Sequence, residues 1–167
     1  MSVQSRLVAS ALAMTLLSAS LPAEAQTVQV KSSASFASLT GSWAGGGQVK
    51  FADGKTERIT CRAYYNHKGS GEELGLAIRC ASTSYKIEIR ANVTNENGKL
   101  SGRWEERTFN VEGDVTGRAS SGNINMAIAG GGLSGSMSVT YGSSTQAVSI
   151  TTEGTNLKGV TISLSRG

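Results

Sequence analysis

The sequence predicts an all-β fold, an antiparallel up-and-down β-barrel of about 8–10 strands with one disulfide. Apolar and polar residues alternate with a period of two over most of the chain, which is typical of half-buried strands. Glycines recur inside these alternating segments, and nothing after residue 25 has the periodicity of a long helix. A two-sheet β-sandwich is the alternative architecture, because it uses the same kind of strands.

The first 25 residues are predicted to be a signal peptide. Arg6 precedes an apolar run at residues 7–17, and the small-residue site Ala23-Glu24-Ala25 follows. Cleavage after Ala25 would place the protein in the periplasm or outside the cell. The apolar run is too short to cross a membrane, so no membrane span is expected. Residues 26–38 are predicted to form a flexible polar leader, and residues 39–167 a single barrel domain.

The two cysteines, Cys61 and Cys80, are predicted to form a disulfide, because an even number of thiols in an oxidising compartment usually pairs. On the chain-entropy argument, a bridge closing a loop of this length stabilises the fold by about 3 kcal/mol. A metal site is not predicted. His67 is the only histidine, and two cysteines at this separation do not form a zinc motif. No cofactor is expected.

Alternating segments follow one another along the whole of the predicted barrel. Several begin with an apolar residue followed two places later by glycine, which is typical of a strand that bends at a bulge or barrel corner. The segments lie at residues 39–51, 59–65, 74–80, 85–93, 100–104, 123–129, 133–141, 147–152 and 160–164.

Turn residues predict how some of these strands pair. Asn97-Gly98 is the signature of a two-residue type I′ turn. That turn sets three cross-strand pairs: Ala91 with Trp104 inside the barrel, and Arg90 with Glu105 and Glu88 with Arg107 outside it.

Three consecutive glycines, Gly45 to Gly47, lie two residues after Trp43 in the first predicted strand. A phosphate-binding loop is not expected, because alternation rather than a helix follows them. A three-residue loop around Asp53-Gly54 would place Gly45 and Gly47 inside the barrel, opposite Ala63 and Cys61. The missing side chains then either make room for packing or leave a hollow.

A row of basic residues is predicted on the outer face. Alignment of the two cysteines puts the hairpin tip at Ser70-Gly71 and Arg62 opposite Arg79. A short turn at Ser82-Thr83 would then bring Lys86 beside Arg79, with no acid in the row. Like charges facing each other destabilise a sheet, so the row is either an anion site or an ordinary exterior screened by solvent.

Signatures of an enzyme are not found. His67 lies in the predicted hairpin tip "NHKGSGEE", without the partners of a nucleophilic triad. The paired acids Glu72-Glu73 and Glu105-Glu106 are sequence neighbours, so on a strand their side chains point to opposite faces. We therefore expect a protein without catalytic activity.

The start and end of the predicted barrel resemble the calycin group, the lipocalins and avidins. The features that carry the resemblance are Gly41-Ser42-Trp43 on the first strand, the all-β meander and Arg166 after the last strand. It implies a barrel that binds a small apolar ligand, with Trp43 packed near Arg166. The chain also resembles periplasmic protease-inhibitor barrels and small exported bacterial β-barrel proteins of unassigned activity.

The leading functional hypothesis is a monomeric, exported binding module with no role in binding nucleic acid. A small apolar ligand would bind in a barrel mouth lined by Trp43, Tyr65, Tyr85 and Trp104, or an anionic surface or protein partner would bind the row Arg62, Arg79 and Lys86. The alternative is a periplasmic inhibitor that inserts the leader or the hairpin tip into a protease or lysozyme. An outer-membrane barrel is disfavoured because the outward positions are polar.

Overall fold

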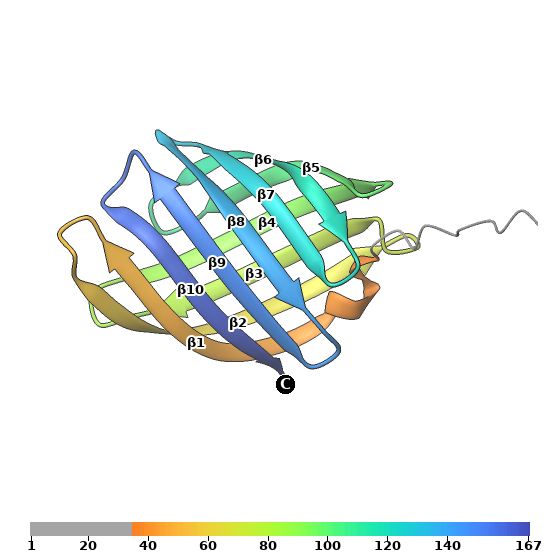
Figure 1. The fold of residues 1–167 in the computed structure, drawn as a ribbon, viewed down its shortest axis with the longest axis horizontal. Coiled ribbons are helices and arrows are strands. Elements are labelled where there is room, and N and C mark those ends of the chain that lie inside the picture. Colours follow the sequence, from red (N-terminus) through yellow and green to blue (C-terminus); the bar gives the residue numbers. More distant parts are fainter. Residues whose placement is uncertain (1–34) are drawn as a thin grey trace, which may run out of the picture. The chain divides into compact units, whose positions relative to one another are not determined.

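In the computed structural model, which describes residues 35–167, ten antiparallel strands close into a barrel (Figure 1). Each strand pairs with the next one in the chain, and β1 pairs with β10. Because the sheet closes on itself, the predicted barrel is confirmed and the two-sheet sandwich is excluded. The predicted signal peptide and most of the leader lie outside the described residues. The strands are β1 Gly41–Phe51, β2 Thr56–Lys68, β3 Glu73–Ala81, β4 Lys86–Glu96, β5 Lys99–Glu106, β6 Val111–Ser120, β7 Asn123–Gly130, β8 Leu133–Tyr141, β9 Thr145–Glu153 and β10 Leu157–Arg166.

The glycines after Trp43 let the first and last strands lie close together. A Cβ atom on Gly45 would collide with the carbonyl oxygen of Ser163, and one on Gly47 with that of Thr161. Both carbonyls belong to β10, the neighbour of β1 across the closure (Figure 1). Gly45 and Gly47 therefore allow the backbones of β1 and β10 to lie close together, because any side chain at these positions would push the two strands apart.

Two predicted registers are confirmed. In the β4–β5 hairpin, Asn97 and Gly98 both have positive φ, 54° and 87°, and Ala91 faces Trp104. Arg90 lies opposite Glu105, and the N–H of Arg107, just beyond β5, donates to the carbonyl of Glu88 at 2.8 Å. In the β2–β3 hairpin, Cys61 faces Cys80 and Arg62 faces Arg79.

The β1–β2 register is shifted by two residues from the expectation. Gly45 faces Cys61 and Gly47 faces Ile59, so the predicted partners Ala63 and Cys61 are wrong. The reason is the position of the turn. The N–H of Phe51 donates to the carbonyl of Lys55 at 2.9 Å, so residues 52–54 form the loop and it is centred on Asp53 rather than Gly54.

The β3–β4 register is shifted by two residues as well. The turn contains four residues, Ser82–Tyr85, closed by a hydrogen bond from the N–H of Ser82 to the carbonyl of Tyr85 at 2.8 Å. Lys86 consequently faces Ala81, and Glu88 faces Arg79. The predicted position of Lys86 beside Arg79 is wrong.

The disulfide between Cys61 and Cys80 is confirmed and joins directly opposite residues of β2 and β3. Cys61 is fully buried among the core side chains, and Cys80 is half-buried on the same inner face. The covalent link therefore lies inside the barrel and fixes the register of this hairpin.

A short 3₁₀ helix, η1 (Phe36–Leu39), precedes the barrel and contributes to its core. Phe36 and Leu39 are each 1% exposed and belong to the same hydrophobic cluster as Trp43. Residues 36–38 were expected in the flexible leader. They instead form this helix, because its two apolar side chains bury themselves in the end of the barrel.

Candidate functional site

At the end of the barrel where β1 begins, Trp43 contacts both η1 and Arg166. The η1 helix supplies Leu39, whose carbonyl accepts a hydrogen bond from Trp43 Nε1 at 2.7 Å. The Arg166 guanidinium lies 4.4 Å above the Trp43 ring and also donates to the carbonyls of Ser38, Thr40 and Ser143. Every donor nitrogen of this guanidinium thus has a backbone acceptor.

Burial of large side chains is most complete at this end, which we call the closed end. The most fully buried large side chains are Phe36, Leu39, Trp43, Leu100 and Leu164 at the closed end, together with Cys61. From the middle of the barrel to the opposite end, burial of the inner face is mixed: Val49, Ile59, Val115 and Val160 are buried, whereas other apolar side chains are half-buried. They include Phe51, Ile78, Ile87, Ile89, Ile128 and Leu133. We call the end opposite η1, near which most of these half-buried side chains lie, the open end.

The four aromatic residues predicted to line the mouth do not lie together. Trp43 and Tyr65 are buried at the closed end, with their rings edge to face and centroids 6.5 Å apart. Tyr85 is exposed in the turn before β4, at the open end, and packs on Phe51 at 5.4 Å. Trp104 is half-buried on the inner face of β5. Of the four, Trp104 and Tyr85 belong to the open half.

Tyr65 forms the main polar contact inside the closed half. Its hydroxyl donates to Oε1 of Gln146 on β9 at 2.9 Å, and both residues are buried. Burial raises the pKa of Tyr65 to about 12, and the hydrogen bond to Gln146 offsets only part of this effect. The phenol is therefore neutral at physiological pH and acts as a structural hydrogen-bond donor.

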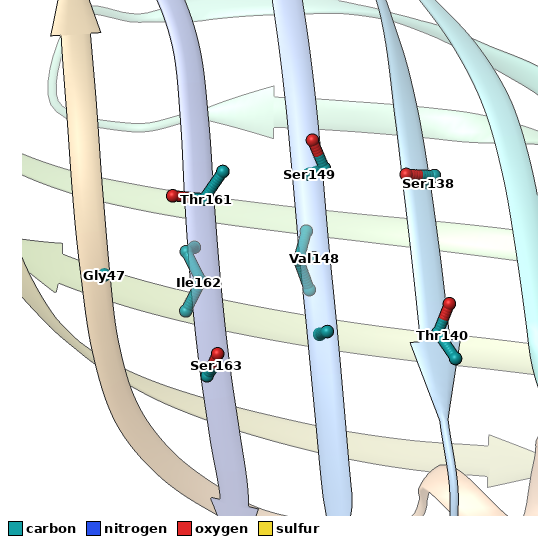
Figure 2. Close-up of a pocket in the computed structure, with 9 residues that line it drawn as sticks. Gly47, Ser138, Thr140, Val148, Ser149, Thr161, Ile162 and Ser163 are labelled. Atoms are coloured by element: carbon teal, nitrogen blue, oxygen red, sulfur yellow. The ribbon is translucent and has the colours of Figure 1, made fainter.

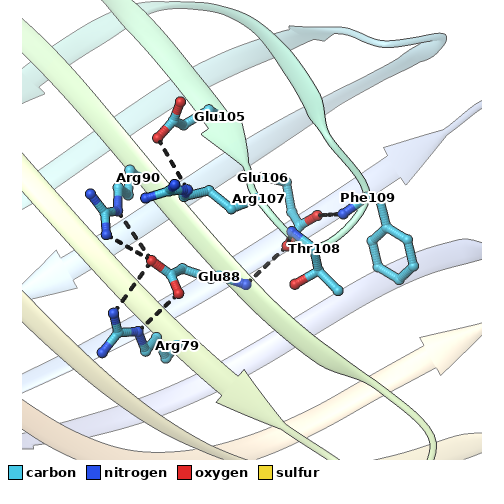
Figure 3. Close-up of polar contacts among 8 residues, drawn as sticks. All are labelled: Arg79, Glu88, Arg90, Glu105, Glu106, Arg107, Thr108 and Phe109. Atoms are coloured by element: carbon cyan, nitrogen blue, oxygen red, sulfur yellow. Dashed lines mark hydrogen bonds and ion pairs between the residues drawn. The ribbon is translucent and has the colours of Figure 1, made fainter.

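The outer basic row contains an acid, contrary to the expectation. Glu88 accepts from Arg79 Nε at 3.0 Å and from Arg90 Nη2 at 3.0 Å, and Figure 3 shows its carboxylate between the two guanidinium groups. The hydrogen bond to Arg79, followed by that to Arg90, lowers the pKa of Glu88, so it is ionised at neutral pH. The row of Arg62, Arg79 and Lys86 is therefore interrupted by a negative charge.

A second carboxylate organises the turn after β5. Glu106 is buried, and its two oxygens accept hydrogen bonds from the N–H groups of Glu88, Thr108 and Phe109 (Figure 3). Burial raises its pKa, but these hydrogen bonds outweigh that effect and leave the pKa below the ordinary value of 4.5. The Phe109 ring projects from this turn and is exposed at the open end.

A shallow groove of about 350 Å³ crosses the outer face of β8, β9 and β10 and reaches Gly47 on β1. Figure 2 shows the hydroxyl groups of Ser138, Thr140, Ser149 and Thr161 along it. None of its lining residues is charged or aromatic. The groove therefore offers weak hydrogen-bonding groups that water satisfies equally well, and it ranks below the interior as a ligand site.

A second groove, of about 540 Å³, lies at the closed end beside the β2–β3 turn and the β4–β5 hairpin. The turn is anchored, because the N–H of Phe36 donates to Gly71 at 3.1 Å and that of Asn95 to Glu72 at 2.7 Å. The hairpin tip predicted as an inhibitory loop is thus held against the barrel and η1. The leader, the other predicted inhibitory segment, lies mainly outside the described residues.

Residues 35–167 contain neither a metal-binding cluster nor a membrane-spanning helix. No group of three or more histidine, cysteine, aspartate or glutamate side chains in this part of the chain could hold a metal ion. The same residues contain no helix that is both long and apolar enough to cross a membrane.

Comparison with known proteins supports the architecture. No protein-family model matches the chain, and no curated protein matches it in sequence. Among solved structures, Rv2717c from M. tuberculosis matches with a TM-score of 0.63 and 12% identity, covering 78% of this chain and 94% of that one. The S-type phycobiliprotein lyase CPES from Guillardia theta matches with a TM-score of 0.53 and 13% identity, covering 78% and 87%. Both are calycin-like barrels, so the predicted calycin-like fold is supported.

The pocket residues predicted from the sequence are all aromatic, whereas aliphatic side chains form most of the open half. Ile87 and Ile89 on β4, and Met126 and Ile128 on β7, lie on the half-buried inner face. The alternating pattern had already placed them on one face of their strands. Their position along the barrel axis depends on how each strand is aligned with its neighbours, which alternation does not determine.

Proposed function

We propose that this protein is a non-enzymatic binding barrel that takes a small, largely apolar ligand into its interior through the open end. The observation that supports this proposal is the difference between the two ends. Apolar side chains are fully buried around Trp43 and Leu164, whereas inner-face residues such as Ile87, Ile128 and Leu133 are half-buried.

The energetics of the half-buried side chains favour a ligand there. Covering apolar surface contributes roughly 25 cal/mol for each Å² removed from water. A barrel of ten strands is also wider than one of eight, whose interior side chains just fill.

We further propose that the protein acts after export. The predicted signal peptide supports this location, and the Cys61–Cys80 disulfide is compatible with an oxidising compartment. The outer row offers less support for an anionic partner than the interior does for an apolar ligand, because Glu88 pairs with both Arg79 and Arg90.

Fluorescence titration with the apolar dye N-phenyl-1-naphthylamine tests the proposal. We expect saturable enhancement with the wild-type protein and at least about tenfold weaker binding by Ile128→Trp, whose larger ring fills the open half beside Gly135. The control is Ala127→Trp, the neighbouring outward position on β7, which should bind like the wild type.

The result is interpreted only for variants with a cooperative thermal transition. If the wild type gives no saturable enhancement, the proposed function is wrong. If Ala127→Trp weakens binding as much as Ile128→Trp, the dye binds the outer face, and the interior site is wrong.

A further inference from the structure

The barrel interior contains a hydrogen-bond donor that the protein itself does not satisfy. Among residues 35–167, Nε1 of Trp104 is a buried side-chain nitrogen without any hydrogen-bond partner. The other tryptophan differs, because Nε1 of Trp43 donates to the carbonyl of Leu39 at 2.7 Å. Phenylalanine would fill a purely apolar position without this cost, so an unsatisfied indole N–H asks for a partner supplied from outside the chain.

The cross-strand neighbours of Trp104 have small side chains or none. On β4 it faces Ala91, and on β6 it faces Gly113, so the indole lies between two of the smallest residues. The next inward position on β5 toward the closed end is Gly102. The indole is itself half-buried, so part of the ring borders space that solvent reaches. Nε1 itself is covered, so a ligand contacts this donor only when the ring turns toward the interior.

The charges around the open half select the chemistry of that molecule. Within the described barrel, the inward-facing positions from the middle to the open end carry no lysine, arginine or histidine. They do carry Glu57 and Glu106, and Glu106 lies on the same face of β5 as Trp104. A carboxylate or phosphate group would find no counter-charge here and two negative charges nearby, which disfavours an anionic ligand.

We propose that Trp104 Nε1 donates a hydrogen bond to the ligand, and that the ligand is an uncharged apolar molecule with an acceptor oxygen, such as a ketone, ester or amide. This inference rests on the proposed function and refines it. Aliphatic side chains contribute the apolar contact, and Trp104 fixes the position of the oxygen. The orphan donor then gains its partner only in the complex, which makes it a determinant of specificity.

Displacement of N-phenyl-1-naphthylamine by matched competitors tests this inference. Decan-2-one and undecane have the same number of non-hydrogen atoms, but only the ketone has an acceptor. We expect the ketone to displace the dye from the wild type about tenfold more effectively than the alkane, since the bond also satisfies a buried donor. In Trp104→Phe, which keeps an aromatic ring and loses the donor, the two competitors should become equal. Decanoate should compete more weakly than decan-2-one with the wild type.

The outcomes separate this inference from the proposed function. Dye binding with equal displacement by ketone and alkane from the wild type would refute the donor role and leave the binding barrel intact. A ketone preference that persists in Trp104→Phe would also refute it. Stronger competition by decanoate would overturn the uncharged ligand. Failure of the wild type to bind the dye at all would instead remove the proposed function.

Discussion

Arg166 at the end of β10 stacks on Trp43 near the start of β1, with the guanidinium carbon 4.4 Å from the ring centroid. The two residues also face each other in the β1–β10 ladder. This contact was implied by the resemblance to lipocalins and avidins, and it is confirmed. Since the guanidinium also binds three backbone carbonyls, one residue joins the last strand, the first strand and η1.

Substitution of Arg166 should therefore destabilise the closed end. We expect Arg166→Ala to lower the free energy of unfolding by about 2 kcal/mol, through loss of the cation–π contact and charged hydrogen bonds. Arg166→Lys should recover less than half of this, because an ammonium group lacks the planar fork that reaches several acceptors. Guanidinium chloride unfolding followed by tryptophan fluorescence measures both. Full recovery by lysine would contradict the role of the fork.

The Cys61–Cys80 disulfide should raise the free energy of unfolding by an amount that depends on the length of the loop it closes. We expect the double variant Cys61→Ala/Cys80→Ala to lose about 3 kcal/mol of unfolding free energy at 25 °C. Chemical denaturation measures the loss, and reduced wild-type protein is the matched control. Mass spectrometry of the oxidised protein should show two hydrogens gained on reduction. Two free thiols in the purified protein would contradict the bridge.

Gly47 should tolerate no side chain, because its Cβ would collide with the backbone of β10. We expect Gly47→Ala to lower the unfolding free energy by about 1–3 kcal/mol, the usual cost of forcing atoms into a packed position. Gly142→Ala is the control, since the nearest atom to its Cβ would be Thr145 Oγ1 at 3.9 Å. Equal thermal stability of the two variants would show that the close approach of β1 and β10 is not required.

Glu106 should make the fold sensitive to acid. Its folded-state pKa lies below 4.5, so its ionised form stabilises the protein at neutral pH, and this contribution is lost as the pH falls through the folded-state pKa. We expect Glu106→Gln to cost about 1–2 kcal/mol at pH 7, with a smaller difference from the wild type at pH 3. Glu105→Gln, on the outer face, is the control. A difference independent of pH would contradict a role for the charge.

Alternation along the sequence predicts the face of a side chain but not its height in the barrel. A shift of two residues keeps every inward residue inward, so the pattern cannot distinguish registers that differ by two. The Asn97-Gly98 signature resolved this ambiguity for β4 and β5. The turn Ser82–Tyr85 contains no glycine or proline, and its four-residue length was not apparent, so Lys86 was placed beside Arg79.

Contacts between distant segments were the other part that the sequence did not predict. Tyr65 was correctly placed on the inner face, but its partner Gln146 lies 81 positions away. The burial of Phe36 by η1 depends on the shape of the barrel end, which exists only after the strands close. The unsatisfied N–H of Trp104 could not be predicted either, because it is defined by the absence of acceptors around a particular ring.

The pairing of β1 with β10 affects the order in which the strands can pair and where the chain could be cut and rejoined. Nine ladders join consecutive strands, and only this one joins segments far apart in sequence. Local hairpins can form first, whereas the ring closes only after residues 157–166 are present. The N–H of Gly167 donates to the carbonyl of Ser42 at 3.0 Å, so these two points are neighbours in space. A circular permutant that joins residue 167 to residue 35 through a flexible linker, which keeps η1, and that opens at Gly131-Gly132 would retain all ten ladders while making the β7–β8 pairing the long-range step in folding.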